Sequence, residues 1–182
     1  MFRRVVIVIS FAVAGIVAFA VLASDDGTPG SSEVSSPALL AVDAVAGLPE
    51  TVAELPVVDA AGFRSLMAKL RGTPVVVNLW AAWCEPCEVE MPRLAEAARA
   101  HPGVQFIGID TLDSRESAEA FIDELSVPFP SLFDPQGVVR TELDSIGLPV
   151  TAFFDAGGNQ IAKVDGELSQ RDLDEHLEAI EG

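Results

Sequence analysis

The feature that most constrains the fold is an apolar run that leads into two closely spaced cysteines. Residues 75–79 are aliphatic and mostly β-branched apart from Asn78, which is typical of a strand buried on both faces. From Val89 onward the apolar residues return with helical spacing, so a helix follows. The turn between strand and helix carries Cys84 and Cys87. The sequence therefore predicts two thiols at the start of a helix.

This position determines what the two thiols can do. The first N–H groups of a helix lack intrahelical partners, and together with the helix dipole they favour a thiolate on Cys84. Pro86 is tolerated there because a first-turn residue has no intrahelical N–H bond to lose. Cys84 and Cys87 can therefore close a disulfide and reopen it by exchange with another thiol. The pattern indicates redox chemistry.

Two other interpretations of the cysteine pair have less support. A zinc site needs four ligands, and beyond this pair the chain has only His101 and His176, without metal-ligand spacing between them. A purely structural disulfide would close so small a loop that it would constrain little of the unfolded chain. We therefore predict a redox-active pair with no metal and no cofactor.

Two motifs carry a resemblance to a known family. Residues 83–92, WCEPCEVEMP, match the pattern WCxPCxxExP and resemble the membrane-anchored TlpA/ResA-like branch of the thioredoxin superfamily. Residues 147–154, GLPVTAFF, resemble the cis-proline loop of that family and the strand after it. The resemblance covers roughly residues 55–180 and implies a thioredoxin fold.

The resemblance also implies catalytic roles. Cys84 would form a mixed disulfide with the substrate, and Cys87 would resolve it. Glu90 occupies the glutamate position of the motif, and helical spacing returns it to the face of Cys87, where a buried carboxylate could hold or pass a proton. The alternative for Glu90 is a surface residue favoured by the helix dipole. Asn78 stands where ordinary thioredoxins have a buried aspartate and cannot relay protons, which increases the need for Glu90.

A substrate-binding surface is implied beside the disulfide. In this fold the proline of the second motif is cis, and the loop backbone pairs with a substrate strand. Trp83 is expected to flank the exposed sulfur, whereas Trp80 is expected in the core. The predicted substrate-binding residues are Trp83, Glu85, Pro86, Leu148 and Pro149.

Strand-like and helix-like stretches alternate along the chain, which predicts an α/β fold with a mixed central sheet flanked by helices. The expected strands are residues 55–58, 75–79, 104–109, 127–133 at an edge, and a hairpin of 150–154 with 160–164. Three of the expected helices begin at the caps Asp59, Asp113 and Ser169. A fourth begins at the cysteine turn, and a fifth covers residues 138–146. The extra helix and strand between Asp110 and Pro149 match the central insertion of the TlpA-like branch.

The N-terminal segment predicts export. Arg3 and Arg4 precede residues 5–23, which contain no charge and are long enough, at about 1.5 Å per residue, to cross the hydrocarbon core of a bilayer. No basic residue follows until Arg64, so the positive-inside rule places the N-terminus in the cytoplasm and the remainder outside. We interpret this segment as a single-pass anchor. The alternative is a cleaved signal peptide and a secreted domain.

The boundaries of the chain's parts follow from composition. Residues 1–23 are the predicted anchor or signal segment. Residues 24–47 are rich in Ser, Gly, Pro and Asp and are predicted to be a flexible tether. Residues 48–182 are predicted to form a single thioredoxin-like domain.

Charge excludes one class of partner and suggests a direction for the chemistry. The 182 residues include 28 acidic and 11 basic side chains, a formal net charge of −17, which makes nucleic acid an improbable partner. Near the cysteines, Glu85, Glu88 and Glu90 oppose a thiolate, and no Lys or Arg lies between Arg71 and Arg93. Because a strong oxidant needs a stabilised thiolate, we expect a raised thiol pKa and a reducing potential.

The predicted function is therefore that of a thiol-disulfide oxidoreductase that reduces disulfides in exported proteins. The resemblance adds a substrate, the haem-binding cysteine pair of apocytochrome c, and a partner, a membrane reductase that supplies electrons. One alternative is an oxidant that donates disulfides to exported proteins. An alternative from another class is a thioredoxin-fold module that binds or delivers a metal.

Overall fold

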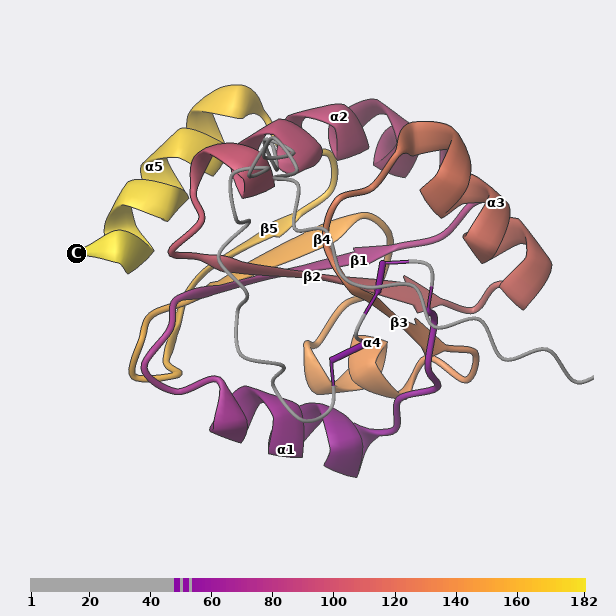
Figure 1. The fold of residues 1–182 in the computed structure, drawn as a ribbon, viewed down its shortest axis with the longest axis horizontal. Coiled ribbons are helices and arrows are strands. Elements are labelled where there is room, and N and C mark those ends of the chain that lie inside the picture. The colour runs from indigo at the N-terminus through magenta and orange to yellow at the C-terminus, as the bar shows by residue number, and fades with distance from the viewer. Residues whose placement is uncertain (1–47, 50, 53) are drawn as a thin grey trace, which may run out of the picture. The chain divides into compact units, whose positions relative to one another are not determined.

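The computed structural model describes residues 48–182 except 50 and 53. Its helices are α1 (Ala60–Lys69), α2 (Glu85–Ala100), α3 (Arg115–Leu125), α4 (Val138–Glu142) and α5 (Gln170–Glu181). Its strands are β1 (Val75–Trp80), β2 (Gln105–Thr111), β3 (Ser131–Asp134), β4 (Val150–Phe154) and β5 (Gln160–Asp165) (Figure 1). The predicted anchor and tether, residues 1–47, lie outside the described residues. No helix in the described part has the length and apolar character needed to cross a membrane.

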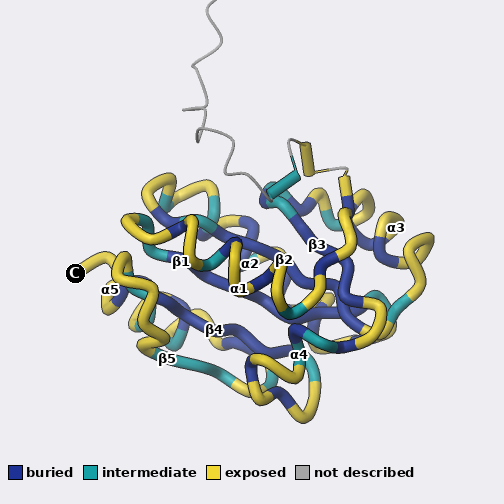
Figure 2. Tube along the Cα trace, turned by 90° about the horizontal axis from the view of Figure 1, so that it is seen from below, coloured by how far each residue is buried: buried dark blue, intermediate teal, exposed yellow. Residues whose placement is uncertain are grey.

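The strands form one mixed sheet in the order β3-β2-β1-β4-β5. β1 pairs in parallel with β2 and antiparallel with β4. β3 is parallel to β2, and β5 is antiparallel to β4. Every residue of β1 is buried, whereas β5 has exposed and half-buried residues only (Figure 2). The predicted thioredoxin fold is confirmed.

Helices cover both faces of the sheet (Figure 1). Alternation along β1 turns Val76 and Trp80 toward α2, α3 and α5, and turns Val77 and Leu79 toward α1 and α4. Apolar helix residues at three- and four-residue spacing close each core. Phe121 of α3 stacks on Trp80 with ring centroids 4.6 Å apart, so Trp80 lies in the core as predicted.

The predicted strand over residues 55–58 is wrong. Only Val57 forms a bridge, to Phe133 of β3. Two backbone hydrogen bonds join this segment to β3. Val58 N–H donates to the Phe133 carbonyl at 2.9 Å, and Phe133 N–H donates to the Pro56 carbonyl at 2.8 Å. Because Pro56 has no N–H, it can accept a ladder bond but cannot donate one, which favours a bridge over a strand.

Two helix boundaries also differ from the prediction. α3 is capped by Ser114, whose hydroxyl accepts from Ser117 N–H at 3.1 Å, and not by Asp113. α4 ends at Glu142 instead of residue 146, and Asp144 then adopts a left-handed backbone with φ of 50°. The predicted caps Asp59 and Ser169 are confirmed. The hairpin of β4 and β5 is confirmed as well.

Candidate active site

The site lies where three segments meet at one end of the sheet. β1 ends at Trp80, whose register partner in β2 is Asp110. On the other side Leu79 pairs with Val150, the first residue of β4. The loop after β1, the loop after β2 and the loop before β4 are therefore neighbours. This places the cysteine turn beside the predicted cis-proline loop.

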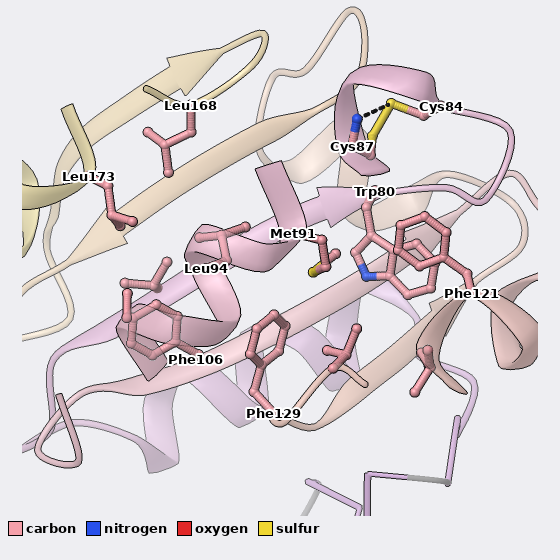
Figure 3. Packing of buried hydrophobic residues seen from close by; sticks show 14 of the residues in the cluster. Trp80, Cys84, Cys87, Met91, Leu94, Phe106, Phe121, Phe129, Leu168 and Leu173 are labelled. Atoms are coloured by element: carbon pink, nitrogen blue, oxygen red, sulfur yellow. Dashed lines mark hydrogen bonds between the residues drawn. A yellow bond between two sulfur atoms is a disulfide. The ribbon is translucent and has the colours of Figure 1, made fainter. Parts of the chain in front are cut away.

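Cys84 and Cys87 form a disulfide at the start of α2 (Figure 3). Cys84 is the N-cap residue, and its Sγ accepts from the backbone N–H of Cys87 at 3.3 Å. Cys84 is 4% exposed, whereas Cys87 has no exposed surface. An incoming thiol or disulfide can thus reach Cys84 first. Cys87 contacts the core that contains Met91 and Leu94.

Glu90 lies one helical turn beyond Cys87 and is fully buried, so the alternative of a surface residue is excluded. Its Oε1 accepts from the side-chain amide of Asn78 at 2.7 Å. Its Oε2 accepts from the backbone N–H of Leu168, also at 2.7 Å. Burial raises the pKa of Glu90 to about 7, although these two bonds and nearby Arg93 act in the opposite direction. A carboxyl group with this pKa can both accept and release a proton near neutrality.

The predicted substrate-binding residues belong to the cysteine turn and to the loop immediately before β4. Trp83 is 62% exposed, and its indole N–H donates to the Leu112 carbonyl at 3.2 Å. Glu85 and Pro86 are exposed in the first turn of α2. The Leu148–Pro149 peptide bond is cis, as the resemblance implies, with Leu148 half-buried and Pro149 buried.

Several residues near the site were not predicted as site residues. Asp113 Oδ2 accepts from the backbone N–H of Ala82 at 2.6 Å, two residues before Cys84. Ile146 is 92% exposed immediately before the cis-proline loop, and Leu112 is 42% exposed beside Trp83. An isoleucine that precedes a Gly-Leu-Pro turn was a usable sequence signal. The contact of Asp113 with Ala82 crosses two loops and has no local signal.

The described residues contain no group of three or more His, Cys, Asp or Glu side chains that could hold a metal ion. His101 lies instead beside Glu181, with its Nδ1 3.0 Å from a carboxylate oxygen. His176 packs against the ring of Phe153, with centroids 5.0 Å apart. Both histidines therefore have structural contacts away from the cysteines.

Comparison with known proteins identifies the family. The model of the AhpC/TSA family matches residues 51–161. The chain belongs to the AhpC/TSA family. One relative of this AhpC/TSA protein is the thiol-disulfide oxidoreductase ResA of Geobacillus kaustophilus, 29% identical over 132 residues, which are 71% of this chain and 76% of the relative. Another is the thiol:disulfide interchange protein DsbE of Pseudomonas aeruginosa, 33% identical over 135 residues and 74% of each chain.

Solved structures agree with this assignment. DsbF of MTB, determined in mixed oxidised and reduced forms, is 34% identical with a TM-score of 0.58, and the match covers 61% of the AhpC/TSA chain described here and 83% of DsbF. A secreted Mycobacterium tuberculosis disulfide oxidoreductase homologous to E. coli DsbE is 30% identical with a TM-score of 0.57, over 62% and 85% of the two chains. With the Cys84–Cys87 pair, these matches confirm the predicted enzyme class, a thiol-disulfide oxidoreductase.

Proposed function

We propose that this oxidoreductase works outside the cytoplasm as a reductant of disulfides in exported proteins. The observation that carries the direction is the excess of carboxylates around the pair. Glu85 and Glu88 are exposed in the first turn of α2, and Asp113 holds the loop before it. Arg93, the next basic residue along α2, donates to Glu167 at 3.2 Å.

Two effects on the Cys84 thiolate oppose each other. The helix N-terminus and the Cys87 N–H favour it, and a helix terminus contributes roughly 0.3–1 kcal/mol. The carboxylates of Glu85 and Glu88, exposed on the same first turn of α2, have the same sign of charge as the thiolate and disfavour it. We take these carboxylates together to outweigh one helix terminus. A less stable thiolate makes the dithiol form the better electron donor.

The reaction proceeds in two exchanges. The Cys84 thiolate attacks a client disulfide, which forms a mixed disulfide and releases one client thiolate. Cys87 then loses its proton and attacks Cys84 Sγ, which releases the second client thiolate and leaves the Cys84–Cys87 disulfide. Two electrons have moved to the client. Glu90 is suited to accept the Cys87 proton because it lies one turn away with a pKa of about 7.

The client lies over Trp83, Glu85 and Pro86 on one side of the disulfide, and over Leu148 and Pro149 on the other. The backbone of the cis-proline loop pairs with an extended client segment. The TlpA/ResA-like motif and the ResA and DsbE relatives support apocytochrome c as a client. The enzyme's disulfide is then reduced again by a membrane reductase.

The location follows from the sequence before the described domain. Residues 1–23 anchor the chain with its N-terminus in the cytoplasm, residues 24–47 act as a tether, and residues 48–182 work outside. The secreted relative of similar fold is compatible with release after signal cleavage. Protease treatment of intact and lysed cells, read by the size of the chain, separates anchored from released protein.

Trapping of the client tests the proposal. Cys87→Ala retains the attacking sulfur and cannot resolve the mixed disulfide, so exported proteins with cysteine pairs should accumulate on Cys84 in the native cell. Cys84→Ala is the matched control and should trap nothing. The reduction potential, measured against glutathione, should be as low as that of thioredoxin, about −270 mV. A potential near that of DsbA, about −120 mV, would instead establish a disulfide donor.

A further inference from the structure

Asp110 is a fully buried carboxyl group near the end of β2. Its relative exposure is 0%, and neither carboxyl oxygen has a hydrogen-bond partner among the described residues when the group is ionised. An ionised carboxylate in such surroundings is strongly unfavourable. Burial first, and then the neighbouring carboxylates of Asp113 and Asp134, raise the pKa of Asp110 to about 8. Asp110 is therefore protonated at neutral pH.

The side chain of Asp113 is placed to accept a hydrogen bond from protonated Asp110. It lies within side-chain hydrogen-bonding reach of Asp110. Its own oxygens accept two backbone bonds, from Ala82 N–H at 2.6 Å and from Ser114 N–H at 2.7 Å. Backbone donors stabilise the ionised form of a carboxyl group. Asp110 thus carries the proton, and Asp113 is the carboxyl group that backbone donors hold in place.

The other charged groups near Asp110 have their own partners. Asp134 of β3 accepts from Val138 N–H at 2.8 Å and caps the start of α4. Arg115 of α3 attracts the charged form of Asp110, but its Nη1 donates to the Leu55 carbonyl at 2.5 Å. Its guanidinium also stacks on an aromatic ring, with the Cζ 4.7 Å from the Phe133 centroid. On β1 the facing residue is Trp80, which is uncharged.

We propose that Asp110 and Asp113 share one proton and act together as a positioning pair for the redox loop. Protonated Asp110 donates to Asp113, and Asp113 holds the Ala82 amide two residues before Cys84. Loss of the proton adds a second negative charge beside Asp113, which is bonded to Ala82 two residues before Cys84, and this charge disfavours the Cys84 thiolate. By linkage, a thiolate at Cys84 strengthens proton binding at Asp110. The reduction potential therefore includes a protonation step that belongs to neither Glu90 nor the cysteines.

This inference rests on the proposed exchange chemistry of Cys84, but the titration of the pair can be measured without any client. The first experiment is a carboxyl-carbon NMR titration of the full-length chain in detergent micelles, in disulfide and dithiol forms. We expect Asp110 to titrate near pH 8 and the Asp113 signal to respond in the same range. Titration of Asp110 at the ordinary value of about 4 overturns the proposal.

Variants of Asp110 test whether this residue positions the redox loop or only supports the fold. Asp110→Asn retains a donor to Asp113 but cannot ionise, so Ala82 amide exchange should stay slow while the inflection near pH 8 disappears from the potential-versus-pH curve. Asp110→Ala removes the donor, and Ala82 exchange should accelerate by about tenfold. Asp123→Asn, on the exposed face of α3, is the matched control and should change neither. An unchanged inflection in Asp110→Asn contradicts the shared proton, whereas failure to trap clients on Cys84 contradicts only the proposed function.

Discussion

The side-chain amide of Asn78 donates to Glu90 Oε1 over 2.7 Å and thereby joins the central strand β1 to α2. The same amide nitrogen lies 3.0 Å from Thr151 Oγ1 of β4, so three elements meet at one buried group. Asn78 is neutral and can donate at any pH. It therefore fixes the carboxyl group of Glu90 without competing for its proton. Asn78 cannot relay a proton itself, and it positions Glu90, the carboxyl group that can.

Asn78→Asp should destabilise the protein in a pH-dependent way. The substitution replaces a donor with a second carboxylate next to Glu90, and two carboxylates in contact cannot both ionise without a large cost. We expect the free energy of unfolding to fall by roughly 3 kcal/mol at pH 8 and by much less at pH 5, where the pair holds a proton. Urea unfolding at both pH values measures this. Equal losses at the two values would contradict the expected contact between the two carboxyl groups.

Glu90→Gln should flatten the pH dependence of stability. The pKa of Glu90 is raised to about 7, so the folded protein holds this proton more tightly than the unfolded chain. Its contribution is fully present below the unfolded value of about 4.3 and is lost as the pH rises through about 7, for a total of ~3 kcal/mol.

Urea unfolding of the wild type and of Glu90→Gln from pH 4.5 to 8.5 gives the two profiles. Their difference isolates Glu90, because Asp110 contributes to both. Glu88→Gln, at an exposed position of the same helix, is the control and should follow the wild type. If Glu90→Gln loses stability with pH as steeply as the wild type, the buried carboxyl group is not the source of the slope.

Glu88→Lys should make the enzyme more oxidising. Glu88 lies on the first turn of α2, and its N–H contacts the Cys84 carbonyl at 3.3 Å. Reversal of this charge stabilises the Cys84 thiolate, so iodoacetamide should react with Cys84 at a pH lower by about one unit, and the reduction potential should rise by roughly 30 mV. Glu178 is exposed on α5, so Glu178→Lys makes the same charge change far along the chain and is the control. Equal shifts in both variants would point to net charge alone.

Ile146→Ser should weaken client recognition and leave the chemistry intact. Ile146 is 92% exposed next to the cis-proline loop, which suggests that it contacts an apolar client side chain. We expect kcat/KM for a protein disulfide to fall about tenfold, equivalent to about 1.4 kcal/mol, with no change in reduction by dithiothreitol. Ile161→Ser, 47% exposed on β5, is the control. A comparable loss in the control would show a general surface effect.

Local patterns in the sequence predicted most of the fold. The β-branched run of β1 and the helical spacing after Cys87 each encode one element through neighbouring residues. The strand predicted over residues 55–58 failed because pairing depends on a partner far along the chain. There the partner is Phe133, and Pro56 limits the ladder to a bridge.

The site was predictable where chemistry is concentrated in a motif. Cys84, Cys87 and Glu90 share one helix, and their spacing alone places them together. Contacts between loops were not predictable. Leu168 reaches Glu90 across 78 positions of sequence, and the expected helix cap Asp113 instead holds Ala82. A carboxylate before a serine fits both roles, and only the packed structure distinguishes them.

The disulfide spans one helical turn whose backbone bonds are independent of it. Cys87 N–H donates to the Cys84 carbonyl at 3.0 Å, and Cys84 N–H donates to the Ala81 carbonyl at 3.0 Å. Neither bond involves a sulfur atom, so we expect both to remain when the sulfur–sulfur bond opens and the main chain of this turn to keep its course. The turn can then open and close its sulfur–sulfur bond repeatedly on one backbone frame.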